Sequence, residues 1–155
     1  MKTTTKILFP ALLYLLISAA GCNNESTDQP RSEEIQSKKL TATWKIKSAV
    51  LDNVEQDDYG DFVLTLSGGS GSSPNLYVCT GRPLMSPWMA GGTWSFGSSV
   101  LTQLIRDPKT ADKMPMTYSV TDTELVLEFQ FAGEGYPGGR AGSVGGSWKF
   151  KFARQ

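Results

Sequence analysis

Apolar residues beyond position 38 recur mostly at every second position, which is the period of a β-strand. Trp44, Ile46 and Val50 share one face of the first such run, which ends near Leu51. Clusters of Gly, Pro, Asp and Asn separate the runs, and such clusters are typical of turns. The pattern predicts eight strands, over residues 44–51, 62–66, 75–80, 92–97, 99–106, 115–121, 124–132 and 145–153.

The only helix that the sequence predicts is a short one around Ser32 to Lys39, because no window beyond residue 41 holds ten residues of helical periodicity. Eight short strands joined by short loops in about 115 residues favour a single antiparallel up-and-down β-barrel. Closure into a barrel removes the exposed strand edges that invite aggregation. The predicted fold class is therefore all-β, with a two-sheet β-sandwich as the alternative.

Three short motifs repeat the order hydroxyl, Trp, polar, apolar. They are Thr43–Ile46, Thr93–Phe96 and Ser147–Phe150. Because alternate residues of a strand point to opposite faces, each Trp shares a face with the apolar residue two positions later. We therefore predict that Trp44, Trp94 and Trp148 belong to the barrel core. The alternative is that at least one of them lines a ligand cavity.

Residues 1–21 have the layout of a secretory signal, with two lysines ahead of an eleven-residue apolar run. Such a run would span roughly 16 Å as a helix, about half of a ~30 Å hydrocarbon core, so it is too short to be a transmembrane anchor. The small residues directly before Cys22 resemble the bacterial lipobox, although Ala19 stands where Leu is usual. That resemblance implies cleavage before Cys22 and diacylation of its thiol. The alternative is an ordinary secreted protein cut after Ala20 or Gly21.

Residues 22–37 are predicted to be the lipidated Cys and a flexible tether, because this segment is polar and holds almost no apolar residue except Ile35. Multiple acyl chains on one Cys make membrane residence effectively permanent without spanning the bilayer. Loss of residues 1–21 leaves 13 Lys and Arg against 15 Asp and Glu. Residues 38–155 then form the barrel domain. The predicted location is the bacterial cell envelope, lipid-anchored at the outer membrane on its periplasmic or its surface face.

Four motifs resemble those of the lipocalin-like lipoproteins of Bacteroidetes-type bacteria. They are an opening Leu-x-Gly-x-Trp at Leu40–Trp44, with Ala42 in the place of Gly, a Gly-Thr-Trp-x-Phe at Gly92–Phe96, a late strand motif at Tyr118–Phe129 and a closing Trp-x-Phe-x-Phe at Trp148–Phe152. The resemblance covers about residues 38–153. It implies a lipid-anchored, lipocalin-like β-barrel outside the cytoplasm. Its motifs are structural, so it carries over no catalytic residue and no ligand.

The composition excludes several classes of function. No His is present, which excludes Ser-His-Asp and Cys-His catalysis and His-ligated metals. Fifteen basic residues balance fifteen acidic ones, so the chain lacks the positive charge that nucleic-acid binding requires. The acidic residues Asp107, Asp112, Glu124 and Glu128 have no spacing that would bring them together. We therefore predict no enzymatic activity, no cofactor and no nucleic-acid partner.

Two further groups of residues resemble functional sites, but we predict a function for neither. Asp57, Asp58 and Asp61 could hold a Ca²⁺ ion, but they lack an Asp-x-Asp-x-Asp-Gly loop, so a solvated acidic turn is favoured and no metal site is predicted. Cys79 lies in a short β-type run and has no intrachain partner if Cys22 is acylated. We predict a buried, unreactive thiol there, because a reactive one needs a strongly electropositive setting.

The segment 80–92 is unusual because it is rich in apolar side chains between two prolines, where a connection is normally polar. One hypothesis is that it lines the mouth of the barrel and binds an apolar or glycan-like small molecule, which would leave Trp88 partly exposed. The candidate ligand-binding residues are Arg82, Met85, Trp88 and Met89, with Tyr136 and Arg140 from the opposite loop. The favoured alternative is that the segment folds over the barrel end as a hydrophobic plug.

Two classes of function therefore remain open. The first is a lipid-anchored binding module whose barrel accepts a small molecule. The second is a structural or accessory envelope lipoprotein with a filled barrel, which acts through protein–protein contacts. The size of the cavity separates them: a pocket of about 300 Å³ or more framed by the candidate residues favours the first, and a filled barrel favours the second. The oligomeric state is not predicted.

Overall fold

The structure is a computed structural model that describes residues 31–69, 72–133 and 144–155. Strands dominate the fold, and one short helix precedes them. In chain order the elements are α1 (Ser32–Leu40), β1 (Ala42–Leu51), β2 (Val54–Glu55), the 3-10 helix η1 (Asp57–Tyr59), β3 (Val63–Ser67), β4 (Asn75–Thr80), β5 (Gly91–Phe96), β6 (Gln103–Arg106), β7 (Met114–Val120), β8 (Glu124–Phe131) and β9 (Gly146–Arg154).

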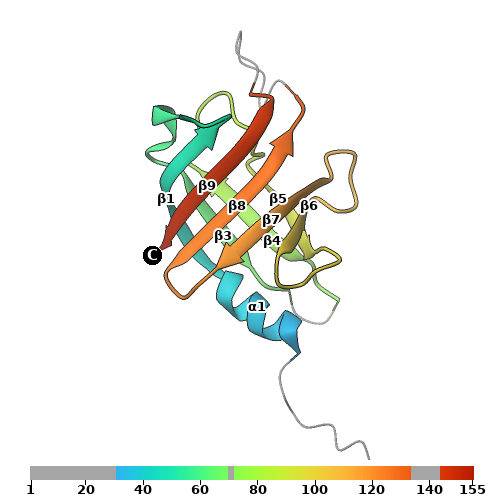
Figure 1. Cartoon of the computed structure of the whole chain (residues 1–155). Coiled ribbons are helices and arrows are strands. Elements are labelled where there is room, and N and C mark those ends of the chain that lie inside the picture. The colour runs from blue at the N-terminus through green and yellow to red at the C-terminus, as the bar shows by residue number, and fades with distance from the viewer. Residues whose placement is uncertain (1–30, 70–71, 134–143) are drawn as a thin grey trace, which may run out of the picture.

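The strands form one antiparallel sheet that closes on itself (Figure 1). Its order is β2-β1-β3-β4-β5-β6-β7-β8-β9, and β9 also pairs with β1, from Trp44 opposite Arg154 to Leu51 opposite Trp148. Strand β2 is only a short return arm on the end of β1, so eight strands make up the wall of the barrel. The predicted up-and-down β-barrel of about eight strands is confirmed, and the sandwich alternative is not the fold.

Most strand ends lie within two residues of the predicted ones, and two larger differences remain. Asp52 and Asn53 interrupt the first run as expected, but they form a two-residue turn with φ of 47° and 67°, which starts the unpredicted hairpin to β2. Strand β6 begins at Gln103, because the backbone N–H groups of Thr102 and Gln103 both donate to the carbonyl oxygen of Ser99 and form a turn. The predicted strand 99–106 is therefore four residues shorter at its start.

The three predicted core tryptophans are buried, as the period-two pattern requires. Each indole N–H also donates to a backbone carbonyl: Trp44 to Leu40 at 2.9 Å, Trp94 to Leu76 at 3.1 Å and Trp148 to Val144 at 2.7 Å. A buried indole whose N–H is paired contributes its full apolar surface without an unmet polar group. Along β9 the rings of Trp148, Phe150 and Phe152 stack in sequence, with ring centroids 5.1 Å and 6.1 Å apart.

Helix α1 lies at the lower end of the barrel in Figure 1. It occupies the residues predicted to be helical and includes positions 32–37, the last part of the expected tether. Leu40 at the end of the helix is buried. The hydroxyl of Tyr118 donates to the carbonyl oxygen of Val100, and the side-chain oxygen of Gln36 on α1 lies 3.4 Å from the same hydroxyl. Burial raises the pKa of Tyr118 to about 12. The guanidinium of Arg154 lies 5.5 Å from the ring centroid of Trp44 at this end.

We expect Trp44→Ala, Trp94→Ala and Trp148→Ala each to lower the free energy of unfolding by roughly 3–5 kcal/mol, because each leaves a ring-sized cavity in the core. Urea unfolding of the unacylated chain 23–155, followed by circular dichroism, measures this loss. Val78→Ala on the outer face of β4 is the control and should cost less than about 1 kcal/mol. Losses below about 1 kcal/mol for all three Trp variants would show that the two faces are reversed.

Candidate functional site

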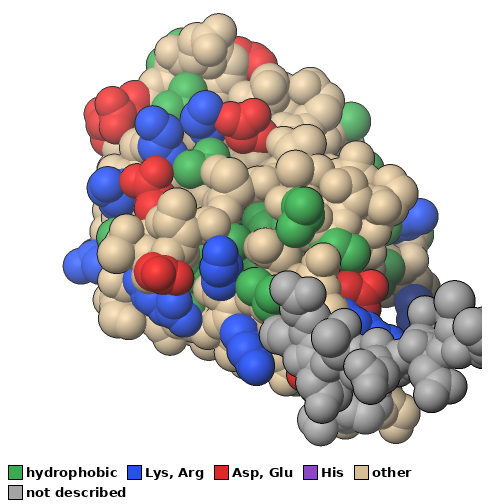
Figure 2. All heavy atoms as spheres, turned by 60° about the horizontal axis from the view of Figure 1, so that its bottom comes forward, with side chains coloured by type: hydrophobic (Ala, Val, Ile, Leu, Met, Phe, Trp, Pro, Cys, Tyr) green, Lys and Arg blue, Asp and Glu red, His purple; other side chains and the backbone are tan. Residues whose placement is uncertain are grey.

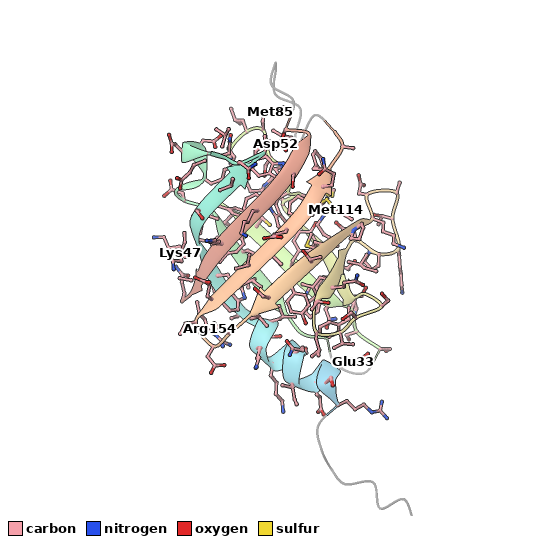
Figure 3. All side chains as sticks on the ribbon, viewed as in Figure 1. Glu33, Lys47, Asp52, Met85, Met114 and Arg154 are labelled. Carbon is pink, nitrogen blue, oxygen red and sulfur yellow. The ribbon has the colours of Figure 1, made fainter. Side chains whose placement is uncertain are left out.

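The upper end of the barrel, opposite α1, carries the connections 52–62, 81–90 and 107–113, together with residues 132–133 after β8 and 144–145 before β9. Figure 3 places Met85, Asp52 and Met114 at this end and Glu33 and Arg154 at the other. Four of the candidate ligand-binding residues, Arg82, Met85, Trp88 and Met89, lie together on the segment 81–90 between β4 and β5. Tyr136, Arg140 and the predicted lipidation site Cys22 lie outside the described residues.

Trp88 does not lie at the rim but inside the barrel, where only 2% of it is exposed. Its ring is surrounded by four aromatic rings, one from the connection before β3 and three from strands β4, β8 and β9. The ring centroids lie 6.0 Å from Phe62, 6.0 Å from Tyr77, 5.7 Å from Phe129 and 5.8 Å from Phe150. Three of these contacts have the edge-to-face geometry that aromatic pairs prefer. The segment therefore has the arrangement of a plug and lacks the partly exposed Trp88 of a binding mouth.

Polar contacts hold the segment in this position. The hydroxyl oxygen of Ser86, itself fully buried, accepts the backbone N–H of Trp88 at 3.1 Å and lies 3.3 Å from the donating hydroxyl of Tyr59. The guanidinium of Arg82 donates to the carbonyl oxygen of Trp88. Burial is also the main reason that the pKa of Tyr59 is raised well above its ordinary value, so this hydroxyl stays a neutral donor. The plug is thus fixed by its own backbone as well as by its ring.

A buried ion pair lies directly against the plug. Arg106 at the end of β6 is 2% exposed, and its Nε atom lies 3.4 Å from a carboxylate oxygen of Asp107. The guanidinium also donates to the carbonyl oxygen of Pro87 at 2.5 Å and lies 5.6 Å from the ring centroid of Trp88. A buried guanidinium is tolerated only where a countercharge and hydrogen bonds replace its water. Here Asp107 supplies the countercharge, and the hydrogen bond to Pro87 connects Arg106 to the segment that carries Trp88.

Asp107 is held in turn by the neighbouring strands. Its carboxylate accepts the hydroxyl of Tyr77 at 2.7 Å and the backbone N–H of Thr93 at 2.9 Å. Burial and this hydrogen bond raise the pKa of Tyr77 far above its ordinary value. Gly92 leaves room for the pair, because a Cβ atom there would lie 2.1 Å from a carboxylate oxygen of Asp107. The side chains of Arg106, Asp107 and Tyr77 are all buried.

The sequence interpretation missed this cluster, although one signal was present. In β6 the period of two places Arg106 on the same face as the buried Leu104. Of the acidic residues considered for catalysis, only Asp107 is buried, whereas Glu124 and Glu128 lie on the outer face and pair with Lys47 and Lys149. The structure therefore does not bring these carboxylates together.

The interior that remains beside Trp88 is small. A cavity of about 10 Å³ lies between apolar side chains that include Leu66, Trp94 and Met116, and this is about the space that a single water molecule needs. The indole nitrogen of Trp88 has no hydrogen-bond acceptor among the described residues. A larger hollow of about 290 Å³ lies outside the plug, where Asp112, Lys113 and Gln130 meet the apolar side chains of Met114 and Phe131. None of the four described candidate ligand residues lines this hollow.

Cys79 is buried on the inner face of β4, as predicted. Burial is the main cause that raises the pKa of its thiol to about 12, and the nearby Arg82 and Arg106 offset this only in part. The thiol is therefore neutral near pH 7 and is not a nucleophile.

The described residues contain no group of three or more metal-binding side chains. Within the same ranges, no helix has the length and apolar character needed to cross a membrane.

We expect Trp88→Ala to lower the free energy of unfolding by roughly 3–5 kcal/mol, as for a core residue, because it removes the ring that fills the barrel. Leu84→Ala is a matched control in the same segment, since Leu84 is 82% exposed and its loss should change the stability by less than about 0.5 kcal/mol. Urea unfolding of both variants measures the difference. Equal and small effects would contradict the plug.

Comparison with protein-family models, with curated proteins and with solved structures finds no match to this chain. The geometry of the barrel and the features of the sequence are therefore the basis for inferring its function.

Proposed function

We propose that the protein is a lipid-anchored envelope lipoprotein whose filled, lipocalin-like barrel acts through its outer surface and its loops. The packed interior carries this proposal: Trp88 occupies the centre of the barrel and leaves about 10 Å³ beside it. Small-molecule sites usually have about 300–1,000 Å³. A barrel filled to this degree has no room for the apolar or glycan-like ligand of the first hypothesis unless the plug leaves.

The membrane part of the proposal depends on the N-terminal sequence. An apolar run precedes Ala19-Ala20-Gly21-Cys22, and helix α1 begins ten positions after Cys22, at Ser32. Nine intervening residues can span at most roughly 30 Å when extended, so an acylated Cys22 would keep the barrel close to the bilayer. We assign no reaction to the chain, because it has no His and its buried Tyr77, Asp107 and Arg106 are engaged with one another.

A second candidate function is binding of a small polar molecule at the hollow outside the plug. The observation that favours it is the volume of about 290 Å³ with Lys113, Asp112 and Gln130 at its edge. The mixed charges of this lining do not select one ligand class, so the filled barrel remains the main proposal.

The lipid anchor predicts that Cys22→Ser releases the protein from the membrane fraction and abolishes labelling by a fatty-acid analogue. Fractionation of the native host and metabolic labelling measure both effects. Cys79→Ser is the control, because a buried thiol with a raised pKa should be neither acylated nor needed for anchoring. Unchanged membrane partition of the Cys22 variant would refute the anchor.

The filled barrel predicts that the mature protein, purified from its native host, carries no bound small molecule. Native mass spectrometry should then give the mass of the acylated polypeptide alone. A stoichiometric ligand that is released on denaturation would contradict the proposal. Loss of that ligand in Lys113→Ala would assign it to the hollow outside the plug, whereas its persistence would place it elsewhere.

A further inference from the structure

The lower end of the barrel, where helix α1 lies, is the end from which the chain leads back to Cys22. Nine residues separate Cys22 from the first residue of the helix, Ser32. As the flexible tether that the sequence predicts, nine residues would have a root-mean-square length of roughly 17 Å. Strand β9 alone, which also has nine residues, is roughly 30 Å long. An anchor at Cys22 would therefore hold the lower end, and not the upper end, next to the bilayer.

The outward face of α1 is basic and carries one exposed apolar side chain. Leu40 is buried, and Gln36, one turn before it, lies at the hydroxyl of Tyr118, so these two residues mark the side toward the barrel. Glu33, two turns before Leu40, is on that side as well, and Glu34 is at the edge of the outward face. The remaining residues, at about 3.6 per turn, lie on or beside the outward face. They are Arg31, Ile35, Lys38 and Lys39.

A second exposed apolar side chain lies close to the helix, in the connection between β5 and β6. Leu101 is 59% exposed, and Ile35 on α1 is 40% exposed. The connection lies against α1, because the hydroxyl of Tyr118 donates to the carbonyl oxygen of Val100 and lies 3.4 Å from the side-chain oxygen of Gln36. The two exposed apolar residues are thus the chain neighbours of two residues that meet at one hydroxyl group.

Three cations at this end form a group that we call the basic patch. They are Lys38, Lys39 and Arg154. In the part of the chain that the structure describes, no ion pair includes any of them. The guanidinium of Arg154 donates instead to the carbonyl oxygens of Thr41, directly after α1, and Asp122, which leaves its charge uncompensated. In Figure 2, which brings this end forward, blue side chains gather in the lower left of the visible face, with green ones beside them.

The upper end carries the opposite charge. The connection 52–62 holds five acidic residues, all exposed, and no basic one. They are Asp52, Glu55, Asp57, Asp58 and Asp61. An anionic surface attracts the basic patch and repels this acidic connection. Charge therefore orients the barrel in the same direction as the predicted tether does.

Helix stability explains only part of this arrangement. Basic residues in the last turn of a helix interact favourably with its dipole, so Lys38 and Lys39 stabilise α1 by themselves. The dipole gives no reason to expose Ile35 and Leu101, and it does not involve Arg154, which lies on β9. Exposed apolar side chains together with Lys and Arg are typical of a helix surface that lies in the headgroup region of a bilayer.

We propose that the lower end of the barrel docks on the bilayer that holds the acyl chains, with the outward face of α1 against anionic phosphate headgroups. Ile35 and Leu101 enter the headgroup region, and the basic patch binds its phosphates. This docking rests on the proposed function, because the anchor at Cys22 brings this end to the membrane. The acidic upper end, with the plug, then points away from the bilayer.

Fluorescence quenching by lipids tests the docking. The mature acylated protein is reconstituted in vesicles of phosphatidylcholine and phosphatidylglycerol that contain a nitroxide-labelled lipid. A fluorophore on Leu101→Cys should be strongly quenched. One on Leu84→Cys is the matched control and should keep its fluorescence, because Leu84 is an exposed leucine at the other end of the barrel. Cys79 does not take up the fluorophore, because its thiol is buried and its pKa is raised to about 12.

The charge of the basic patch gives a second measurement on the same vesicles. Lys38→Gln should lower the ratio of docked to undocked protein, taken from the quenching at Leu101→Cys, about fivefold, because one basic residue at an anionic surface strengthens binding by about that factor. Lys109→Gln removes an exposed lysine from the upper end and should leave the ratio unchanged. Vesicles of phosphatidylcholine alone should also give a lower ratio. Thermal unfolding verifies that the variants fold.

The outcomes separate the docking from the proposed function. Flotation of the vesicles reports the anchor, and a protein that does not float with them refutes the anchor and the docking together. If the protein floats, equal quenching at positions 84 and 101 overturns the docking and leaves the anchor intact. Equal quenching with and without phosphatidylglycerol overturns the contact with anionic headgroups. Protection of Leu101→Cys from a membrane-impermeant maleimide in native membranes, without quenching in vesicles, would overturn the docking in favour of a protein partner.

Discussion

The burial of one positive charge, that of Arg106, determines how the upper half of the barrel is built. A guanidinium that is 2% exposed needs a countercharge and hydrogen-bond acceptors inside the protein. Asp107 supplies the charge, and the carbonyl oxygen of Pro87 supplies an acceptor. Since Tyr77 and Thr93 hold Asp107, this single requirement connects β4, β5 and β6 to the segment 81–90. The ring of Trp88 follows the backbone of Pro87 into the barrel.

The two ends of the barrel are closed by different means, and together they explain the packed interior. At the lower end, helix α1 contributes Leu40, and the carbonyl oxygen of this residue accepts the indole N–H of Trp44. At the upper end, a segment without helix or strand contributes Trp88, which contacts rings on β4, β8 and β9. An eight-stranded barrel is just wide enough to be filled by side chains. With both ends occupied, little volume is left inside for a ligand.

The sequence predicts the wall of this barrel better than its contents. Alternation along each strand places Trp44, Trp94 and Trp148 correctly, because the inward or outward direction of a side chain is a local property of a strand. The position of Trp88 depends on contacts with Phe62 and Phe150, which are 26 and 62 positions away and which no local pattern relates to it. The sequence could therefore predict that the segment is unusually apolar and propose a plug, but it could not locate the ring.

The buried ion pair of Arg106 and Asp107 could not be predicted from the sequence for a related reason. A charged residue at an inward position, such as Arg106, looks the same in sequence as the end of a strand that is leaving the core. Only the spatial position of Asp107, which has a φ of 48° and turns back toward Tyr77, shows that the charge is compensated. Hydropathy patterns record burial of apolar groups, so a charge-compensated polar cluster inside a barrel is the feature that they detect least well.

On the outside of the barrel, β8, β9 and β1 carry charged side chains, whereas the outward residues of β3 to β7 carry none. Stability does not explain this unequal distribution of charge. Ion pairs between partly exposed side chains, such as Lys47 with Glu124, contribute only about 0–1 kcal/mol, so the barrel would tolerate their presence or absence on any strand. An exposed apolar surface, in contrast, carries a risk of aggregation. Closure of the sheet removes the free edges through which such aggregation usually starts, and it allows Leu76 and Val78 to stay exposed on β4. The exposed pair therefore carries little risk for this fold, because a closed sheet offers almost no free strand edge for another chain to pair with.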